Sequence, residues 1–363
     1  MFRQRPRSDR GCHACRLWRP ADAARSHTRL PGFSGSYLGV DVFFVLSGYL
    51  TTSLAFAPAT GGGVERFKAF MTRRLLRIWP LLLLVVAVTG SVLAVLGQPV
   101  TAEVLSSALF MANVTLPVVS APGVLIHTWT LAAEMQFYAL IAILAILLPS
   151  VRVFRSVAVL LFICVTLSRI AATSGGDWMF VYNSPVTHTS GLFLGAVLAT
   201  LPPLPARQSA ALAFLAMAGI AIGFASATFA TAAALVVWIP IAEVASAAAV
   251  FGLVHGGGLI GTLLRTPLLR RLGVLSYGIY LWHYPIAVLA RNSFAAPTAF
   301  VLTAAASVVL AAASFRWVET PARRLARNLG RARAGEPAPG PARHLSGRKT
   351  DAKPTHDRRL RDA

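Results

Sequence analysis

Charge is scarce in this sequence, and acidic charge is the scarcest. Only 13% of the 363 residues are Asp, Glu, Lys or Arg, whereas soluble chains carry about 25%. Hydrophobic residues make up 56% of the chain and the mean hydropathy is +0.64. This composition excludes an ordinary soluble domain. Apolar runs of about 20 residues, long enough to cross about 30 Å of hydrocarbon, recur along the chain and predict an all-α, polytopic membrane protein.

Cysteine is also rare, and the chain lacks a recognisable secretory signal. Three Cys imply no disulfide framework. Cys12 and Cys15 have the spacing of half a zinc site, but no second half follows, so we expect no metal. Residues 1–29 are rich in Arg and contain no apolar core of the kind that directs secretion. We interpret them as an aberrant basic segment without stable structure.

The net charge of +21 raises the question of nucleic-acid binding. The basic residues, however, fall mainly in short loops between apolar runs and at the two ends of the chain. That distribution sets the orientation of membrane proteins, and it favours anionic lipid headgroups over nucleic acid as partners. We therefore expect contact with membrane lipids and no nucleic-acid function.

Nine apolar segments are candidate membrane spans, and a weaker stretch at 102–118 is predicted to be a loop with a short helix. The segments are 37–56, 76–97, 129–148, 154–173, 187–201, 210–226, 231–254, 274–291 and 297–315. We predict a transmembrane domain over 30–325 and a disordered basic tail over 326–363, where Pro, Gly, Arg and Ala dominate.

Loop charges orient these segments. Basic residues lie in alternate loops, which predicts that those loops and the C-terminus face the cytoplasm in a bacterial inner membrane; they include Arg66, Lys68, Arg73, Arg74, Arg77, Arg152, Arg155, Arg207, Arg265, Arg270 and Arg271. With nine spans and a cytoplasmic C-terminus, the Arg-rich N-terminus would lie outside the cell, which contradicts the rule that basic segments stay in the cytoplasm. One more span before Tyr37 would resolve this conflict, but Arg19, Asp22 and Arg25 would each be costly in lipid.

Five motifs occur in an order that is similar to acyltransferase family 3. Residues 30–50 read LPGFSGSYLGVDVFFVLSGYL and resemble the entry to that family's second helix. Residues 70–80, FMTRRLLRIWP, resemble its basic cytoplasmic loop, and residues 127–138, HTWTLAAEMQFY, resemble its Trp-Ser-Leu helix with Thr in place of Ser. Residues 275–285, LSYGIYLWHYP, and 315–321, FRWVETP, complete the set. The resemblance covers about residues 27–325.

The resemblance implies a ten-helix membrane acyltransferase. Family members that acylate sugars outside the cell often carry a further hydrolase-type domain, and because this sequence ends too soon for one, we expect the stand-alone type. Two departures stand out. His27 sits where the family has a His at the outer end of its first helix, but the preceding segment is not a helix that lipid would accept. A reading-frame shift or misassigned start before residue 27 is our hypothesis, which the upstream DNA sequence tests. His188 stands where many relatives carry an Arg.

Transfer of an acyl group to a hydroxyl needs a base and a polar site for the oxyanion. His27 and Asp41 are both predicted near the outer face, where the carboxylate could orient the imidazole as a base. The alternatives are a solvated loop histidine and an aspartate that caps a helix. Glu134 and His283 lie inside spans, where ionisable groups are candidate site residues. Their alternatives are a structural ion pair and a hydrogen bond between helices.

The basic loop suggests where a donor would bind. Arg73, Arg74 and Arg77 face the predicted cytoplasmic side, and Arg forks suit the phosphates of acyl-CoA, acetyl-CoA first among them. The alternative is that these residues only set topology. The leading hypothesis is transfer of an acyl group to a hydroxyl of a carbohydrate or cell-envelope glycan, with a macrolide-like acceptor also open. A transporter of a lipid-linked sugar or acyl donor, and an inactive product without its first helix, remain alternatives.

Overall fold

The computed structural model describes residues 35–57, 61–98, 101–115, 123–175 and 177–333, and helices are the only regular secondary structure within those ranges. The prediction of an all-α polytopic protein is therefore confirmed. The helices are η3 (Ser36–Leu38), α2 (Gly39–Ala55), α3 (Gly63–Val95), α4 (Thr101–Ala108), α5 (Ala112–Thr115), η4 (Ile126–Thr128), α6 (Trp129–Leu147), α7 (Val151–Thr173), α8 (Trp178–Asn183), α9 (Ser190–Leu198), α10 (Ala206–Ser226), η5 (Ala234–Trp238), α11 (Ile239–Val254), α12 (Gly258–Leu264), α13 (Pro267–Ser293), α14 (Ala296–Ser314), η6 (Phe315–Glu319) and α15 (Thr320–Arg333).

Eight helices in the described part of the chain are long and apolar enough to cross a membrane. They correspond to eight of the nine apolar segments expected from the sequence. The ninth, 187–201, differs, because its helical part α9 has only nine residues. At 1.5 Å per residue, nine residues span about 14 Å, roughly half of the hydrocarbon thickness. Residues 184–189 and 199–205 on either side of α9 are turns and irregular chain.

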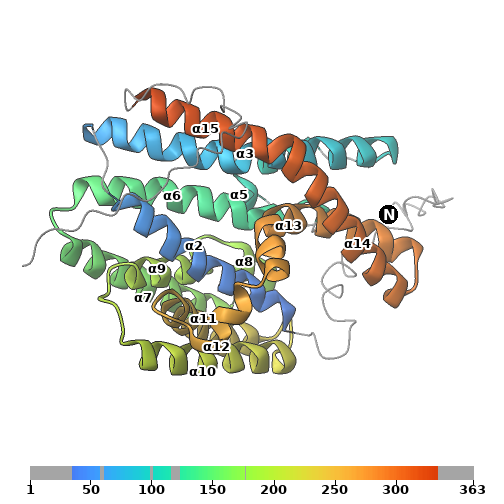
Figure 1. Ribbon diagram of the computed structural model, residues 1–363. Coiled ribbons are helices and arrows are strands. Elements are labelled where there is room, and N and C mark those ends of the chain that lie inside the picture. The colour runs from blue at the N-terminus through green and yellow to red at the C-terminus, as the bar shows by residue number, and fades with distance from the viewer. Residues whose placement is uncertain (1–34, 58–60, 99–100, 116–122, 176, 334–363) are drawn as a thin grey trace, which may run out of the picture.

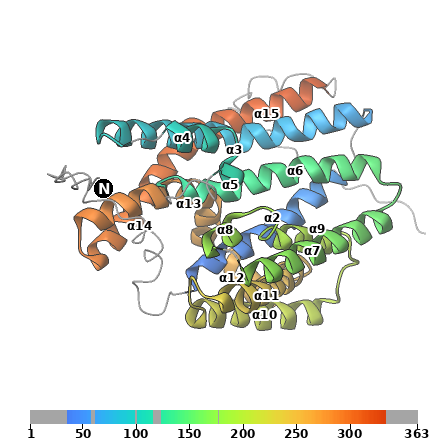
Figure 2. The same ribbon diagram turned by 180° about the vertical axis from the view of Figure 1, so that it is seen from behind.

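The long helices form one bundle in which sequence-distant segments lie side by side (Figures 1 and 2). Both views show α3 and α15 along one edge, α6 next to them, and α10 with α11 along the opposite edge. Helix α2 runs obliquely between these groups and packs against α6, α9 and α11. We call the end of the bundle where α2 begins the proximal end, and the end where α2 finishes the distal end.

Contacts between helix ends establish how the chain alternates between these two ends. The amide of Gly35, just before α2, donates to the carbonyl of Phe224 near the end of α10, with N and O 3.0 Å apart. Phe56, just after α2, packs edge-on against Phe154 near the start of α7, with ring centroids 4.8 Å apart. Helix α10 is thus antiparallel to α2, and α7 begins at the distal end and finishes at the proximal end.

The short α9 must therefore carry the chain back across the bundle. Helix α7 finishes at the proximal end, and α10 begins at the distal end. Helix α9 lies between them and runs alongside α2, with Gly191 near the carbonyl of Asp41 and Gly195 against Tyr49. The chain between α7 and α10 thus crosses as a short helix with non-helical flanks. The alternation predicted from nine segments is kept, although only eight of them form long helices.

Two glycines allow α2 and α9 to approach closely. A Cβ atom on Gly48 of α2 would collide with the carbonyl of Leu192, and one on Gly195 of α9 would collide with the carbonyl of Val45. Small residues of this kind let helix backbones touch inside a membrane. The contact fixes α9 against α2 and so determines which α9 residues face the start of α2.

The last helix extends beyond the predicted end of the transmembrane domain at residue 325. Helix α14 continues without a break through η6 into α15, which runs to Arg333 and packs on α3 (Figure 1). The sequence after 325 was expected to be disordered, but Ala, Leu and Arg are strong helix formers and α3 supplies a packing surface. Residues 334–363, the remainder of the predicted tail, lie outside the described ranges, as do residues 1–34.

Candidate active site

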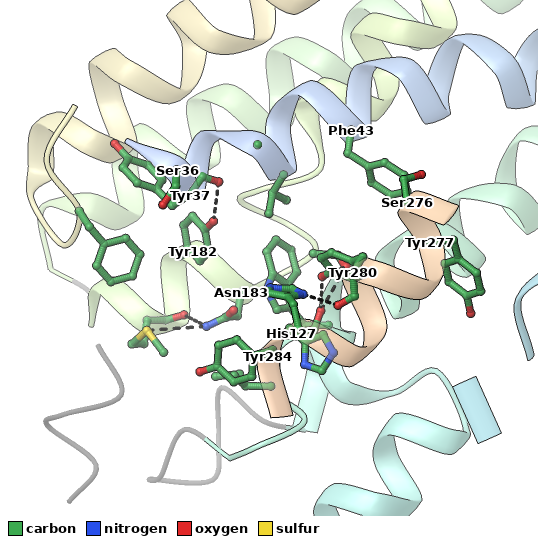
Figure 3. Close-up of a pocket in the computed structure, with 18 residues that line it drawn as sticks. Ser36, Tyr37, Phe43, His127, Tyr182, Asn183, Ser276, Tyr277, Tyr280 and Tyr284 are labelled. Carbon is green, nitrogen blue, oxygen red and sulfur yellow. Dashed lines mark hydrogen bonds between the residues drawn. The ribbon is translucent and has the colours of Figure 1, made fainter. Parts of the chain in front are cut away.

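A cavity of about 520 Å³ opens at the proximal end of the bundle. It is bounded by η3 and the first turn of α2, by η4 and the start of α6, by α8, and by the middle of α13 (Figure 3). Aromatic rings dominate its wall, together with two histidines; the lining residues are Ser36, Tyr37, Gly39, Val40, Phe43, Ile126, His127, Trp129, Thr130, Met179, Tyr182, Asn183, Phe229, Ser276, Tyr277, Tyr280, His283 and Tyr284. Pockets of about 300–1,000 Å³ with few polar groups typically hold small organic ligands.

His127 is anchored to α13 on this wall. Its Nε2 lies 3.2 Å from the carbonyl oxygen of Leu281. The hydroxyl of Tyr280 donates to the carbonyl of His127 at 2.6 Å and lies 2.5 Å from the hydroxyl of Thr130. These bonds tie η4, the first turn of α6 and α13 together around the cavity. The sequence pattern included His127 in a motif but assigned it no role.

His283, a site residue predicted from the sequence, lies on the same wall. Its Nδ1 is 2.5 Å from the carbonyl oxygen of Tyr280. A carbonyl can only accept, so Nδ1 carries a hydrogen, and in the neutral ring the lone pair is on Nε2. The rings of His283 and His127 are 5.9 Å apart between centroids. A neutral imidazole with this tautomer can accept a proton from a hydroxyl bound in the cavity.

Asp41, the second predicted site residue, is fully buried behind the cavity wall and pairs with His188. The distance between Asp41 Oδ1 and His188 Nε2 is 2.9 Å, and neither side chain is exposed. His188 Nδ1 lies 2.5 Å from the carbonyl oxygen of Tyr182. The rings of Trp129 and Tyr182, which line the cavity, pack on the His188 ring. His188 is therefore the partner of Asp41 in the described part of the chain.

A second buried ion pair surrounds Ser190, the first residue of α9, two residues after His188. Arg169 of α7 reaches Glu243 of α11 through both terminal nitrogens, at 3.3 and 3.4 Å, and donates to the hydroxyl of Ser190 at 2.9 Å. Ser190 also donates to Glu243. All three side chains are buried. This cluster holds the first turn of α9 between α7 and α11.

Glu134 lies deeper in the bundle and does not line the cavity. Its carboxyl group accepts hydrogen bonds from Ser47 of α2 and from Tyr138, the latter at 2.9 Å. No basic side chain of the described ranges lies within 4.0 Å of it. The structural ion pair considered for Glu134 is therefore absent there, and a cluster of hydroxyl groups takes its place.

The three arginines of α3 are not equivalent. Arg73 and Arg77 are exposed near the distal end. Arg74 is buried, and its guanidinium lies over the rings of Tyr138 and Phe70, 4.8 and 5.4 Å from the ring centroids. One terminal nitrogen of Arg74 has no hydrogen-bond partner among the described residues. The structure thus separates the buried Arg74 from the two arginines that solvent or a ligand can reach.

Tyr182 and Glu103, which lie outside the long helices, have pKa values above their usual ranges. Burial, with a smaller contribution from Asp41, raises the pKa of the Tyr182 hydroxyl well above its usual range. Burial also raises the pKa of Glu103 in α4, although a hydrogen bond from the amide of Leu125 partly opposes the shift. Tyr182 is therefore a neutral phenol at physiological pH, and Glu103 anchors the chain just before η4.

The site residues predicted from the sequence thus lie at different depths in the bundle. Asp41 and His283 lie at or behind the cavity, Glu134 lies in the middle of the bundle, and the α3 arginines lie toward the distal end. His27 lies outside the described residues, so its proximity to Asp41 stays a prediction. Within the described ranges, no three His, Cys, Asp or Glu side chains gather closely enough to hold a metal ion.

Sequence comparisons place these features in a family. A sequence profile described as "Acyltransferase domain" matches residues 11–316. The chain is 27% identical over 334 residues to a Bacillus subtilis protein named "Putative peptidoglycan O-acetyltransferase YrhL", covering 82% of this chain and 52% of that protein. It is 26% identical over 338 residues to the "Peptidoglycan O-acetyltransferase OatA" of Listeria monocytogenes, covering 82% and 53%.

The chain spans about half the length of the curated relatives it matches. No solved structure matches it significantly. The profile match nevertheless extends over well over half of this chain, from before the predicted transmembrane domain into η6, and it contains every predicted site residue. The chain therefore belongs to acyltransferase family 3.

Proposed function

We propose that the protein transfers an acyl group, acetyl in the first instance, from acyl-CoA to a hydroxyl of a carbohydrate in the cell envelope. The observation that carries the proposal is the aromatic cavity at the proximal end, with His127 and His283 on one wall. Family membership supports acyl transfer as the chemistry. The relatives' printed names make peptidoglycan the first acceptor to test.

The cavity wall suits a sugar better than a charged acceptor. Phe43 and Tyr280 present nearly parallel rings 6.4 Å apart between centroids, and Trp178 stacks on Tyr182 at 4.7 Å behind the wall. Aromatic faces offer apolar contact, while tyrosine hydroxyls offer hydrogen bonds at their edges. A sugar ring has both kinds of surface. Its hydroxyl would then lie within reach of the histidines.

The transfer itself requires a base for that hydroxyl. The base removes the hydroxyl proton as the oxygen attacks the thioester carbonyl carbon, the carbon–sulfur bond breaks, and the departing CoA thiolate takes up a proton. His283 is the candidate base in the described part of the chain. His27 is the candidate implied by the family resemblance. Asp41 Oδ2, which has no hydrogen-bond partner among the described residues, is the atom to which His27 would bond.

The donor would bind at the other end of the bundle. Arg73 and Arg77 are exposed there and carry the fixed, forked charge that recognises phosphate. Arg74, although buried, lies in the same turn and would orient its neighbours through its packing on Phe70 and Tyr138. The distal end would then face the cytoplasm, where acyl-CoA is found, and the cavity would face the periplasm or cell wall.

The experiment is acylation by the purified full-length chain in liposomes, supplied with radiolabelled acetyl-CoA and isolated peptidoglycan. We expect label in an ester that mild alkali releases. Loss of a general base costs about 10²–10⁴ in rate, so His283→Ala and His27→Ala are compared, with His255→Ala, a half-buried histidine at the end of α11, as the control.

The outcomes separate the alternatives. Loss of activity in one histidine variant alone identifies that residue as the base. Wild-type activity in both histidine variants would show that neither His283 nor His27 is the base. Uptake of a lipid-linked sugar without any acylated product would favour a transporter. Absence of product from a well-folded chain, with product restored when an apolar first helix is supplied, would identify this chain as an inactive form.

A further inference from the structure

Four ionisable side chains are sealed together between α2, α7, α9 and α11, behind the cavity. Asp41 and His188 form one pair, and Arg169 and Glu243 form the other. The side chains are at most 1% exposed, and none of them lines the cavity. Burying a charge in this way is costly unless an opposite charge and hydrogen bonds compensate it, so the charges of this group must balance.

Arg169 and Glu243 balance each other. A guanidinium keeps its charge in proteins, and Glu243 meets it with both carboxylate oxygens. Asp41 is left to His188. The other titratable groups that face this region are Tyr37 and Tyr182, with Tyr280 across the cavity wall. A phenol cannot supply a positive charge, so no other described side chain can compensate an ionised Asp41.

The hydrogen bonds of His188 specify how many protons the pair holds. The carbonyl of Tyr182 can only accept, so His188 Nδ1 carries a hydrogen. The contact between Nε2 and Asp41 Oδ1, at 2.9 Å, needs one further proton between the two atoms. A neutral ring facing an ionised Asp41 would bring two lone pairs together. The pair therefore holds one proton more than a neutral imidazole and a free carboxylate.

We propose that His188 is held as an imidazolium that fixes Asp41, and that this makes it a positioning residue for the cavity. The link to the cavity is direct, because Trp129 and Tyr182 pack on the His188 ring at 5.2 and 4.5 Å between centroids and both line the cavity. Loss of the extra proton leaves Asp41 uncompensated and loosens α8 and α9 against α2. The dependence of activity on this proton rests on the proposed acyl transfer.

The first test does not need activity. The full-length chain, labelled with ¹⁵N-histidine in detergent micelles, gives ring-nitrogen signals that distinguish an imidazolium from a neutral ring. The His188 signals are identified by their loss in His188→Asn. We expect both ring nitrogens to be protonated at neutral pH. A single protonated ring nitrogen at neutral pH would overturn the proposal, because the shared proton would then belong to Asp41.

The second test is thermal unfolding of the same chain from about pH 6 to about pH 9, the range in which histidine titrates. The stabilisation is present while the ring holds both protons and is lost as alkaline pH removes the second. We expect the wild-type midpoint to fall toward pH 9, and His188→Arg, whose charge is permanent, to remove that fall. Asp41→Asn also removes it, because a neutral His188 can then accept from the amide.

A control variant and the rate of acyl transfer test whether the effect is specific to His188. His255→Asn, at the distal end of α11, should leave the alkaline fall unchanged. In the acylation assay, the wild-type rate should fall about tenfold per pH unit at the alkaline end, and the His188→Arg rate should not. Parallel slopes in the two proteins would overturn the positioning role. An imidazolium signal without acyl transfer would sink the proposed function and leave the assignment of His188 intact.

Discussion

At the scale of single residues, a candidate site residue could be predicted where its own surroundings in the sequence reveal it, and could not where only a contact with a distant residue does. Asp41, Glu134 and His283 were predicted because each is an ionisable group inside an apolar run, which is recognisable locally. The pairing of Asp41 with His188 could not be predicted, because His188 is 147 residues away in the chain and only the packing of α9 on α2 brings the two side chains together. His127 was overlooked for the same reason, since its contact with Leu281 spans 154 residues.

Substitutions of Glu134 can show whether its buried carboxyl group has a structural or a functional role. Its partners are hydroxyl groups of Ser47 and Tyr138. Glu134→Gln keeps an oxygen acceptor, whereas Glu134→Ala removes the acceptor that the two hydroxyls share and leaves them only their contact with each other, at 3.1 Å. A buried polar group left without its partner costs about 1–3 kcal/mol. We expect the Gln variant to unfold close to the wild-type temperature and the Ala variant well below it. A Gln variant that is stable but inactive in the acylation assay would assign Glu134 a functional role.

Glu103 provides a pH-dependent prediction. Burial raises its pKa in the folded protein above the usual 4.5. The fold therefore favours the neutral carboxyl, and the stability it contributes is present below pH 4.5 and lost as pH rises through the folded value. Glu103→Gln does not titrate and still offers an acceptor to the Leu125 amide.

The measurement is the unfolding midpoint of both proteins as a function of pH. The two should agree at acidic pH, and Glu103→Gln should become the more stable protein as pH rises. Glu65→Gln, at an exposed carboxylate near the start of α3, is the matched control and should not reproduce this divergence. A wild type that gains stability over Glu103→Gln with rising pH would contradict the assigned direction.

At the scale of elements, the long spans could be predicted and the short ones could not. A run of about 20 apolar residues has few alternatives to a membrane helix, and eight such runs formed helices. Segment 187–201 is apolar only after its first four residues, and α9 ends at Leu198, before Pro202 and Pro203. Nothing in its local sequence indicates that Arg169 and Glu243 hold its first turn. Helix length there depends on tertiary contacts.

The close approach of α2 and α9 gives a prediction at this scale. Gly48→Ala and Gly195→Ala would each push a methyl group into the facing backbone, and overpacking costs about 1–3 kcal/mol. Gly39→Ala is the matched control, because no atom lies within 4 Å of its added Cβ. We expect lower unfolding midpoints for the first two variants and little change for the third. Equal midpoints for all three would mean that α2 and α9 can separate without loss.

At the scale of the whole molecule, the structure reconciles the predicted topology with the observed helices. Basic residues such as Arg66, Arg155 and Arg207 lie near the distal starts of α3, α7 and α10. That grouping requires an odd number of crossings between the start of α2 and the end of α14, although only eight helices of the described residues are long enough to cross a membrane. The short crossing through α9 supplies the ninth. Which membrane face the distal end meets is not fixed by the fold and stays a prediction from the positive-inside rule.

Single cysteines on either side of α9 test this arrangement directly. In a chain whose three cysteines are replaced by Ser, Ser174→Cys lies after α7 and Gln208→Cys lies in the first turn of α10, both at exposed positions. A membrane-impermeant maleimide added to intact cells should label Ser174→Cys, and it should label Gln208→Cys only after permeabilisation. Thr228→Cys, exposed after α10, should behave like Ser174→Cys and confirms that α10 crosses fully. Because no long helix separates residues 174 and 208, opposite accessibility can arise only if α9 and its flanks cross the membrane, and equal accessibility would refute that crossing together with the inferred orientation of every later helix.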